Sequence, residues 1–219
     1  ALGNYILSGS SGFATTLPLK FGFFAGLDFT FHPRDSSLTF RLKARHSTII
    51  QDGLPSVTPS AIQIHREQIG LGFLFAPFQE SSGAFQKFKA GLSYQVIGRL
   101  ATDTSPNTVV SSALTHGLAA DILWDGNLGR LFRFETGVNV TLPFFFKEIT
   151  SSSGSHALAL STQAVFTLIY PITDVLEIGL GLDWRLDWFR YSGSGTRGTN
   201  DADELDNAFG LPLEIRFKF

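Results

Sequence analysis

The sequence predicts a chain built from strands alone, closing into one transmembrane, antiparallel, up-and-down β-barrel over residues 1–219. Three observations support this fold class. Through most of the chain apolar and polar residues alternate with the period of two that a strand requires. No apolar run reaches the roughly 18–20 residues of a transmembrane helix. The predicted strands are also longer than the about five or six residues usual in soluble sheets.

Composition agrees with a single barrel. Hydrophobic residues make up 43% and charged residues 16%, and Phe and Gly are both abundant at 22 each. The net charge of −2 gives no basis for nucleic-acid binding. Cysteine is absent, which excludes a disulfide framework and a cysteine-based metal site. The sequence opens at Ala1 without Met or a charged-then-apolar leader, which we interpret as a mature, exported chain.

Four strands are predicted in the first half of the chain. In each, apolar side chains occupy every second position, while charged residues or glycines fill many of the others. Turn residues such as Pro33 to Ser36 separate the strands. The strands cover Leu19–His32, Leu38–Ser47, Ala61–Ala76 and Phe85–Leu100.

Five strands are predicted in the second half. Tight-turn signals lie at Asp125-Gly126-Asn127 and at Pro171–Asp174, and Ser192–Asn207 is expected to be the longest loop. Val175–Tyr191 has the clearest alternation of all. The strands cover Ser112–Asp125, Arg130–Pro143, Ala157–Tyr170, Val175–Tyr191 and Phe209–Phe219.

Connection lengths decide the strand number. Short turns are expected after His32, Ala76, Asp125 and Tyr170, and long loops after Ile50, Leu100, Phe144 and Tyr191. A barrel with both termini on the short-turn side needs an even number of strands, and Leu2–Gly12 would supply the tenth. The alternative is a barrel of eight or nine strands whose N-terminal residues 1–16 lie in the lumen as a plug.

The last eleven residues, Phe209–Phe219, are apolar on one face, mostly polar on the other, and end on an aromatic ring. This segment resembles the closing strand of bacterial outer-membrane β-barrel proteins. The resemblance, which is to the architecture, implies a Gram-negative outer membrane with both termini in the periplasm. It also implies contact with lipid and lipopolysaccharide, and folding by the barrel-assembly machinery, which would recognise Phe219.

Strand parity separates wall from lumen. Aromatic residues of outward parity are expected to form membrane girdles, mostly at the short-turn end. They are Phe31, Phe40, Phe75, Phe88, Trp124, Phe132, Tyr170 and Phe219. Three further aromatic residues, Trp188, Tyr191 and Phe144, are expected near the opposite rim. Charged residues of inward parity are expected to line the lumen and to pair with one another. They are Lys20, Asp28, Arg41, Lys43, Arg45, Lys87, Lys89, Arg99, Asp121, Arg133, Glu135, Glu177, Asp183, Arg185, Asp187, Glu214 and Arg216.

A belt of inward glycines lies between the charged layers. Such glycines leave space for bulky inward neighbours such as Phe24, Leu74 and Ile97. The same belt is also compatible with a thin water-filled path, because ten strands enclose more space than eight. The glycines are Gly70, Gly72, Gly91, Gly117, Gly137, Gly179 and Gly181.

No catalytic group is apparent from the sequence. A hydrolase needs a nucleophile or water beside a histidine and an orienting acid or amide, and the five histidines are scattered. His46 and Ser47 are adjacent, so their side chains point to opposite faces. Asp183 and Asp187 form an inward acidic pair that Arg185 neutralises. We therefore expect a protein that is not an enzyme.

No cofactor is expected. Oxygen ligands in the acidic segment that holds Asp201, Asp203 and Asp206 make it a weak Ca²⁺ candidate, but the spacing differs from an EF-hand, which favours a solvated loop.

The expected function is that of an integral outer-membrane barrel with a narrow polar lumen, acting as a small passive channel or a structural surface barrel. The alternative is an interaction protein, either an adhesin or a barrel subunit of a larger envelope complex with a protein partner. A membrane-embedded hydrolase is a less favoured third reading.

Overall fold

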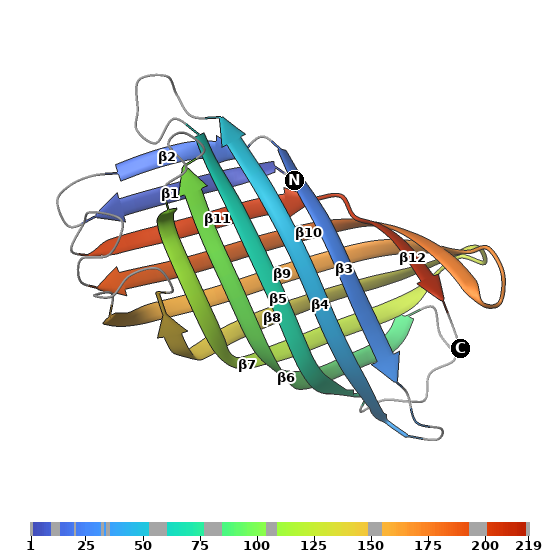
Figure 1. Cartoon of the computed structure of the whole chain (residues 1–219). Coiled ribbons are helices and arrows are strands. Elements are labelled where there is room, and N and C mark those ends of the chain that lie inside the picture. Colours follow the sequence, from blue (N-terminus) through green and yellow to red (C-terminus); the bar gives the residue numbers. More distant parts are fainter. Residues whose placement is uncertain are drawn as a thin grey trace.

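A computed structural model of the chain describes residues 2–9, 14–19, 21–31, 33, 36–52, 61–76, 85–103, 109–148, 155–192 and 201–217. The structural statements below concern these residues. They form strands almost throughout (Figure 1), and they include no helix long and apolar enough to cross a membrane. The strands are β1 (Leu2–Gly9), β2 (Ala14–Leu19), β3 (Phe21–Phe31), β4 (Leu38–Asp52), β5 (Ala61–Phe75), β6 (Phe85–Asp103), β7 (Val109–Leu128), β8 (Phe132–Lys147), β9 (Ser155–Pro171), β10 (Leu176–Ser192), β11 (Ala202–Gly210) and β12 (Leu213–Phe217).

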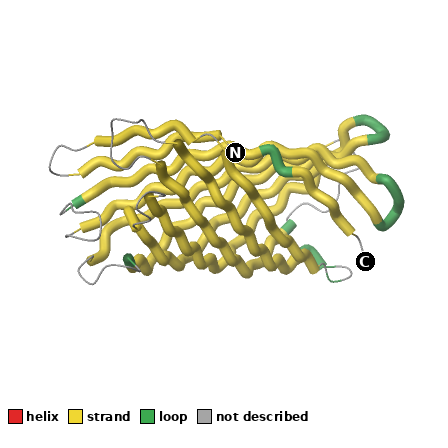
Figure 2. The backbone as a smooth tube through the Cα atoms, turned by 45° about the horizontal axis from the view of Figure 1, so that its top comes forward, coloured by secondary structure: helices red, strands yellow, loops and turns green. Residues whose placement is uncertain are grey.

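The strands pair in one antiparallel sheet in the order β2-β1-β11-β10-β9-β8-β7-β6-β5-β4-β3. From β3 to β11 every strand pairs with its neighbour along the chain, which is the up-and-down topology that the sequence predicts. The sheet coils strongly, so that β3 to β7 cross in front of β8 to β11 (Figures 1 and 2). The fold is therefore an all-β, nearly closed barrel.

Strand β12 continues β11 along the same neighbour. Asp183 of β10 pairs with Gly210, and Leu180 pairs with Leu213, three residues further on in both strands. The register is thus unchanged, and the interruption falls at Pro212, which has no N–H to donate to the ladder. Its carbonyl still accepts a hydrogen bond from Gly181 N at 2.9 Å. The predicted closing strand is confirmed for its described part and begins further upstream.

Strand β1 links the two ends of the sheet over part of the barrel's length, because it pairs with β11 and with β2, the segment that precedes β3. β1 pairs with β11 on one side, where Leu2 faces Phe209, and with β2 on the other. β2 and β3 follow each other with only Lys20 between them, so the twelve segments make ten rows. This confirms the strand prediction for residues 2–9, which do not lie in the lumen as a plug. In the half nearest the C-terminal end, β3 pairs only with β4 and β12 only with β10 among the described residues.

Two predicted connections are wrong. The strand β7 runs through Asp125-Gly126-Asn127, and the turn lies at residues 129–131, where Gly129 has a positive φ of 71°. Gly adopts that backbone conformation without a steric penalty. Residues 202–207, predicted as loop, belong to β11.

The two ends of the barrel also differ less than expected. The connection after Ala76, predicted to be short, lies in a stretch of nine residues between Phe75 and Phe85, and nine residues also separate Ser192 from Ala202. Strand extension on the long-loop side accounts for much of this, because β4, β6, β8 and β11 all run beyond their predicted bounds.

Two glycines of the predicted belt let neighbouring strands approach closely. A Cβ placed on Gly91 would lie 1.9 Å from the carbonyl oxygen of Phe73, and one on Gly72 would lie 2.5 Å from that of Leu92. These are backbone atoms, which cannot move aside as a side chain can. Leu74 and Ile97 are buried in the lumen as predicted.

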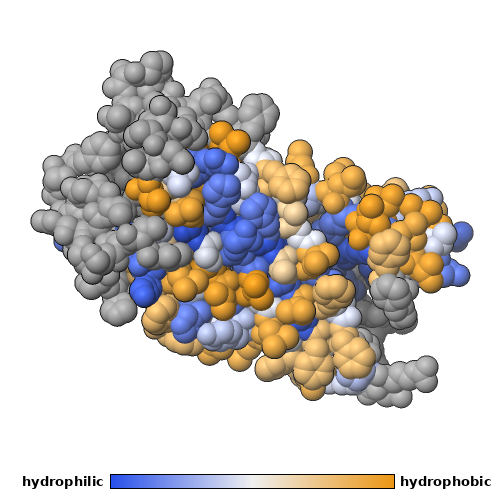
Figure 3. All heavy atoms as spheres, viewed as in Figure 1, coloured by the Kyte–Doolittle hydropathy of each residue, from blue (hydrophilic) through white to orange (hydrophobic). Residues whose placement is uncertain are grey.

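The two faces of the barrel wall have opposite chemistry. Among the described residues, buried polar and charged side chains outnumber buried apolar ones. Large apolar side chains are exposed instead, with Leu71 at 63%, Leu180 at 59% and Phe217 at 64%. Figure 3 shows such apolar groups over much of the visible wall, with hydrophilic groups between them.

Candidate functional site

The aromatic residues of the predicted girdle point outward where the structure describes their side chains. Phe31, Phe40, Phe75, Phe88, Trp124, Phe132 and Tyr170 are all between 39% and 66% exposed. Neighbouring rings touch around the wall, as in the pairs Phe132–Tyr170 and Trp124–Phe134, with centroids 5.6 and 5.9 Å apart. Phe219 lies outside the described residues.

At the other rim the outcome is mixed. Trp188 is half-buried in the wall, and Phe144 is exposed. The prediction for Tyr191 is wrong, because its side chain is buried in the lumen. There its hydroxyl donates a hydrogen bond to Glu204 at 2.7 Å.

An ion network crosses the lumen between opposite walls. It contains three arginines and three carboxylates, all buried: Arg66, Arg99, Arg185, Asp187, Glu204 and Asp206. Arg66 Nε lies 2.7 Å from Asp187 Oδ2, Arg99 Nη2 lies 2.8 Å from Glu204, and Arg185 Nη2 lies 3.2 Å from Asp206. The formal charges cancel, as burial of so many ions requires.

Some of these contacts are ion pairs without aligned hydrogen bonds. The Nε–H groups of Arg66 and Arg185 lie 2.7 and 3.2 Å from Asp187 Oδ2, yet neither points at that oxygen. Directed bonds come from other atoms: Arg66 Nη1 donates to Gln68 at 2.8 Å, and Ser161 Oγ donates to Asp187. Arg66 Nη2 also donates to Asp187 Oδ1 at 3.3 Å, and Arg185 Nη2 donates to Asp206 Oδ2 at 3.2 Å, so charge and directed hydrogen bonds together hold the network.

An apolar cluster fills the lumen beyond the ion network, toward the long-loop end. Three aromatic rings lie at its centre, with centroids 5.3 Å apart for Phe146–Tyr191 and 6.1 Å apart for Phe146–Phe189. The Arg99 guanidinium stands 5.4 Å from the Phe189 ring, which joins the cluster to the network. The members are Ile49, Ile62, Ile64, Ala101, Ala113, Phe146, Ala159, Phe189, Tyr191 and Ala208.

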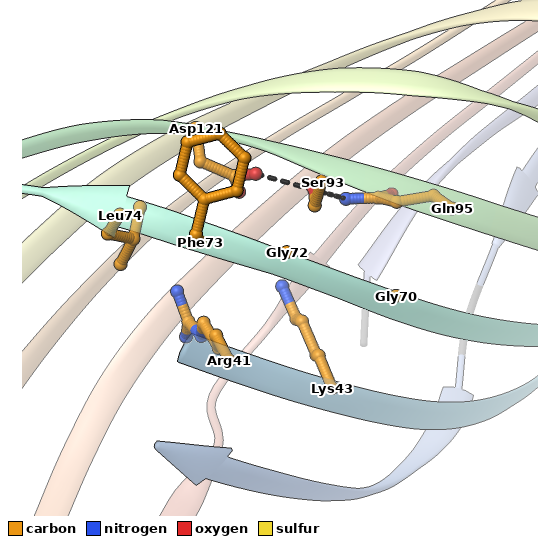
Figure 4. Close-up of a pocket in the computed structure, with 9 residues that line it drawn as sticks. All are labelled: Arg41, Lys43, Gly70, Gly72, Phe73, Leu74, Ser93, Gln95 and Asp121. Atoms are coloured by element: carbon orange, nitrogen blue, oxygen red, sulfur yellow. Dashed lines mark hydrogen bonds between the residues drawn. The ribbon is translucent and has the colours of Figure 1, made fainter. Parts of the chain in front are cut away.

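A polar belt occupies the middle of the lumen (Figure 4). Asp121 accepts a hydrogen bond from Ser93 at 2.6 Å, as Figure 4 shows. It accepts another from Asn139 at 2.8 Å, and Lys43 donates to Gln163 at 3.0 Å. Arg45 pairs with Asp183. Two small cavities remain here. In each, the centre of a water molecule can occupy about 20 Å³, which is room for roughly one or two waters.

Smaller groups of ion pairs, separate from the ion network, lie toward the short-turn end. Arg41 Nε lies 2.9 Å from both carboxylate oxygens of Asp28, in a pair that is partly exposed. The other pairs are Arg133–Glu177, Lys89–Asp125, and Arg216 with Glu135 and Glu214. The structure thus places the predicted lumen residues inside and joins most of them in ion pairs, whereas Lys43 and Asp121 hydrogen-bond to the neutral side chains of Gln163, Ser93 and Asn139. Lys20 and the side chain of Lys87 lie outside the described residues.

Sequence reasoning missed part of the interior. Arg66 and Gln68 have the parity of the inward Gly70 and Gly72 on their own strand, so parity alone would have placed them in the lumen. Glu204 and Asp206 lie in the segment predicted as loop, where Asp203, Leu205 and Asn207 alternate too weakly to show which face is apolar.

The weak Ca²⁺ candidate does not form a common site. Asp203 lies on the outer face, 3.9 Å from Arg190, while Asp206 points into the lumen toward Arg185. Asp203 and Asp206 are three positions apart on β11, and because side chains alternate along a strand, they face opposite sides of the barrel wall. Among the described residues no cluster of three or more His, Asp or Glu side chains is arranged to hold a metal ion.

No protein-family model matches the chain, and comparison with curated protein sequences gives no match.

Proposed function

We propose that this chain is an integral β-barrel of a bacterial outer membrane and that it serves as a structural surface barrel rather than as an open channel. The observation that carries the proposal is the reversed distribution of side chains, with apolar groups exposed around the wall and ion pairs buried inside. Soluble monomers rarely expose contiguous apolar surface on this scale. A closed barrel satisfies its backbone hydrogen bonds within lipid. In this nearly closed barrel β1 joins β11 to β2, while β3 and β12 each pair on one side among the described residues.

The length of the apolar wall fits a bilayer. The outer face of β5, followed from the short-turn end, carries the apolar residues Phe75, Phe73, Leu71 and Ile69 and then its first charged residue, Glu67. Eight residues separate Phe75 from Glu67, or about 26 Å along a strand at about 3.3 Å per residue. A strand tilt of about 40° reduces this to about 20 Å along the barrel axis, close to the apolar band of about 25 Å in outer-membrane barrels.

The filled lumen favours a structural barrel over a channel. The apolar cluster and the ion network occupy successive levels of the interior, and their members are buried. A water path through these levels would require opposite walls to separate and buried ion pairs to break. The alternative is an interaction protein with a partner in the envelope. Its lumen would be equally non-conducting, and it would differ only in what the loops bind.

Conductance in planar bilayers tests the proposal. The refolded full chain is added at concentrations where its insertion is verified by protease protection and by heat-dependent migration in gels. We expect no reproducible open level. A steady single-channel conductance would overturn the structural reading and leave the small passive channel.

With membrane placement come the partners that the resemblance implies: outer-membrane lipid, lipopolysaccharide and, during folding, the barrel-assembly machinery. The termini would then lie on the periplasmic side.

A further inference from the structure

A hydroxyl, two imidazoles and a carboxylate meet on the outer wall, where β4 pairs with β5. His46 lies opposite Glu67 in the register, and Thr48 lies opposite His65, so all four side chains face outward together. His46 Nδ1 contacts Glu67 Oε1, and His46 Nε2 lies 3.0 Å from Thr48 Oγ1. His65 Nδ1 lies 3.0 Å from the same hydroxyl oxygen.

With His46 neutral, the contacts allow one set of proton positions. A carboxylate only accepts, so His46 Nδ1 carries a proton and donates it to Glu67, which leaves Nε2 as an acceptor. Thr48 has a single hydroxyl proton, which His46 Nε2 accepts. His65 Nδ1 must then be the donor to Thr48 Oγ1. The arrangement is a carboxylate that orients an imidazole, which in turn accepts the proton of a hydroxyl. It has the geometry and the roles of a nucleophile, base and acid triad.

The surroundings of this triad are apolar. The exposed side chains around it are Ile69, Leu42 and Leu71 toward the girdle, Ile50 on the other side and Phe23, whose ring centroid lies 6.5 Å from that of His46. His46 is 38% and Glu67 is 62% exposed, so the groups are accessible from outside the barrel. A substrate that reaches Thr48 must therefore tolerate a largely apolar surface.

We propose that Thr48, His46 and Glu67 form a hydrolytic site for acyl esters of membrane lipids, against the expectation from sequence that the chain is not an enzyme. The substrate class rests on the proposed membrane placement. In that placement the triad lies about 20 Å from the aromatic girdle, at the far border of the apolar band. The ester linkages of lipids lie at such a border, between acyl chains and headgroups.

The reaction balances with water as the second substrate. Thr48 Oγ1 bonds to the ester carbonyl carbon, its proton passes to His46 Nε2, and the carbonyl electron pair moves onto oxygen. The carbonyl then re-forms, the bond to the alcohol oxygen breaks, and the alcohol leaves with the proton from His46. Water attacks the acyl-threonine in the same way, gives a proton to His46, and the fatty acid leaves as that proton returns to Thr48 Oγ1.

The other two groups assist. Glu67 stabilises the imidazolium that forms at His46. His65 carries an N–H directed at Thr48 Oγ1, from which it would donate to the negative charge that develops beside that oxygen.

The test uses the refolded full chain in detergent micelles with p-nitrophenyl palmitate as the probe. We expect hydrolysis by the parent, and a loss of about 100-fold or more in kcat/KM for Thr48→Val and for His46→Asn. Thr48→Ser should rescue most of the activity that Thr48→Val loses. Matched controls are Thr162→Val, at another outward threonine, and His116→Asn, at an outward histidine that contacts Tyr94 at 2.6 Å. Both should hydrolyse the probe as the parent does.

A second readout does not depend on turnover. A hexadecyl fluorophosphonate should attach to Thr48 of the parent, found by mass spectrometry of the labelled peptide, and should not attach in His46→Asn. A folded parent that neither hydrolyses the ester nor takes the label would overturn the proposal and leave an interfacial hydrogen-bond cluster only. Because micelles replace the bilayer, this failure is distinct from a failure of the membrane placement.

Discussion

Replacing Asp187 with alanine removes the carboxylate on which two buried arginines converge. Asp187 is fully buried, with Arg66 at 2.7 Å and Arg185 at 3.2 Å. In the variant Arg185 keeps Asp206, but Arg66 loses the carboxylate that it contacts and keeps hydrogen bonds to the neutral Gln68 and Ser161. Removing one partner of a buried ion pair leaves an uncompensated charge, which costs about 3–5 kcal/mol. We expect the free energy of unfolding to fall by this amount.

The matched control is Asp203→Ala. Asp203 faces outward, 3.9 Å from Arg190, and both side chains are largely exposed, at 46% and 63%. Exposed pairs contribute up to about 1 kcal/mol. Urea unfolding in detergent micelles, followed by tryptophan fluorescence, compares the two variants with the parent. If Asp187→Ala were no more destabilised than Asp203→Ala, the ion network would not be buried in the lumen, and the inward assignment of these strands would fail.

Three further predictions follow from the wall and from the strand contacts. Leu180→Arg, on the outer face of β10, should cost about 2–4 kcal/mol when unfolding is measured from lipid vesicles, whereas arginine at the outward Thr162 should cost clearly less; equal costs would contradict the depth assignment. Gly91→Ala should lower the free energy of unfolding by about 1–3 kcal/mol, because its Cβ would meet the Phe73 carbonyl oxygen. Gly98→Ala should leave it unchanged, since its Cβ would meet only the Glu67 Cβ at 4.0 Å, and melting curves of the two variants check this. Deletion of Phe219 should slow insertion in cells and leave stability in detergent nearly unchanged; unchanged insertion with lower stability would limit Phe219 to an anchor.

Period-two alternation was sufficient to predict the fold. In β10 each outward residue from Leu176 to Trp188 is apolar, so both the strand and its inner face were evident. The same rule placed Asp183, Arg185 and Asp187 in the lumen, where the structure pairs them with Arg45, Asp206 and Arg66, respectively. Parity gives the face of a residue but not the partner across the barrel, because that partner depends on how far each strand is shifted against its neighbour.

Alternation failed where the outer face is itself polar. Asp203 and Asn207 face outward beside the inward Glu204 and Asp206, so β11 has no apolar side that distinguishes a strand from a loop. The outer triad was missed for a related reason. His46 and Thr48 are two positions apart, and the residue that completes the set, Glu67, is brought alongside only by the register of β4 and β5. A search for adjacent residues, such as His46 with Ser47, cannot find such a site.

Quenching of tryptophan fluorescence by lipid tests the central claim, that the apolar wall faces acyl chains. The three tryptophans, Trp124, Trp184 and Trp188, all lie on outward positions of their strands. The chain is refolded into vesicles of phosphatidylcholine and into vesicles whose acyl chains carry bromine, which quenches indole emission on contact. We predict strong quenching by brominated chains and weak quenching by iodide in the surrounding water. Emission that brominated lipid leaves unchanged and iodide quenches readily would contradict the account.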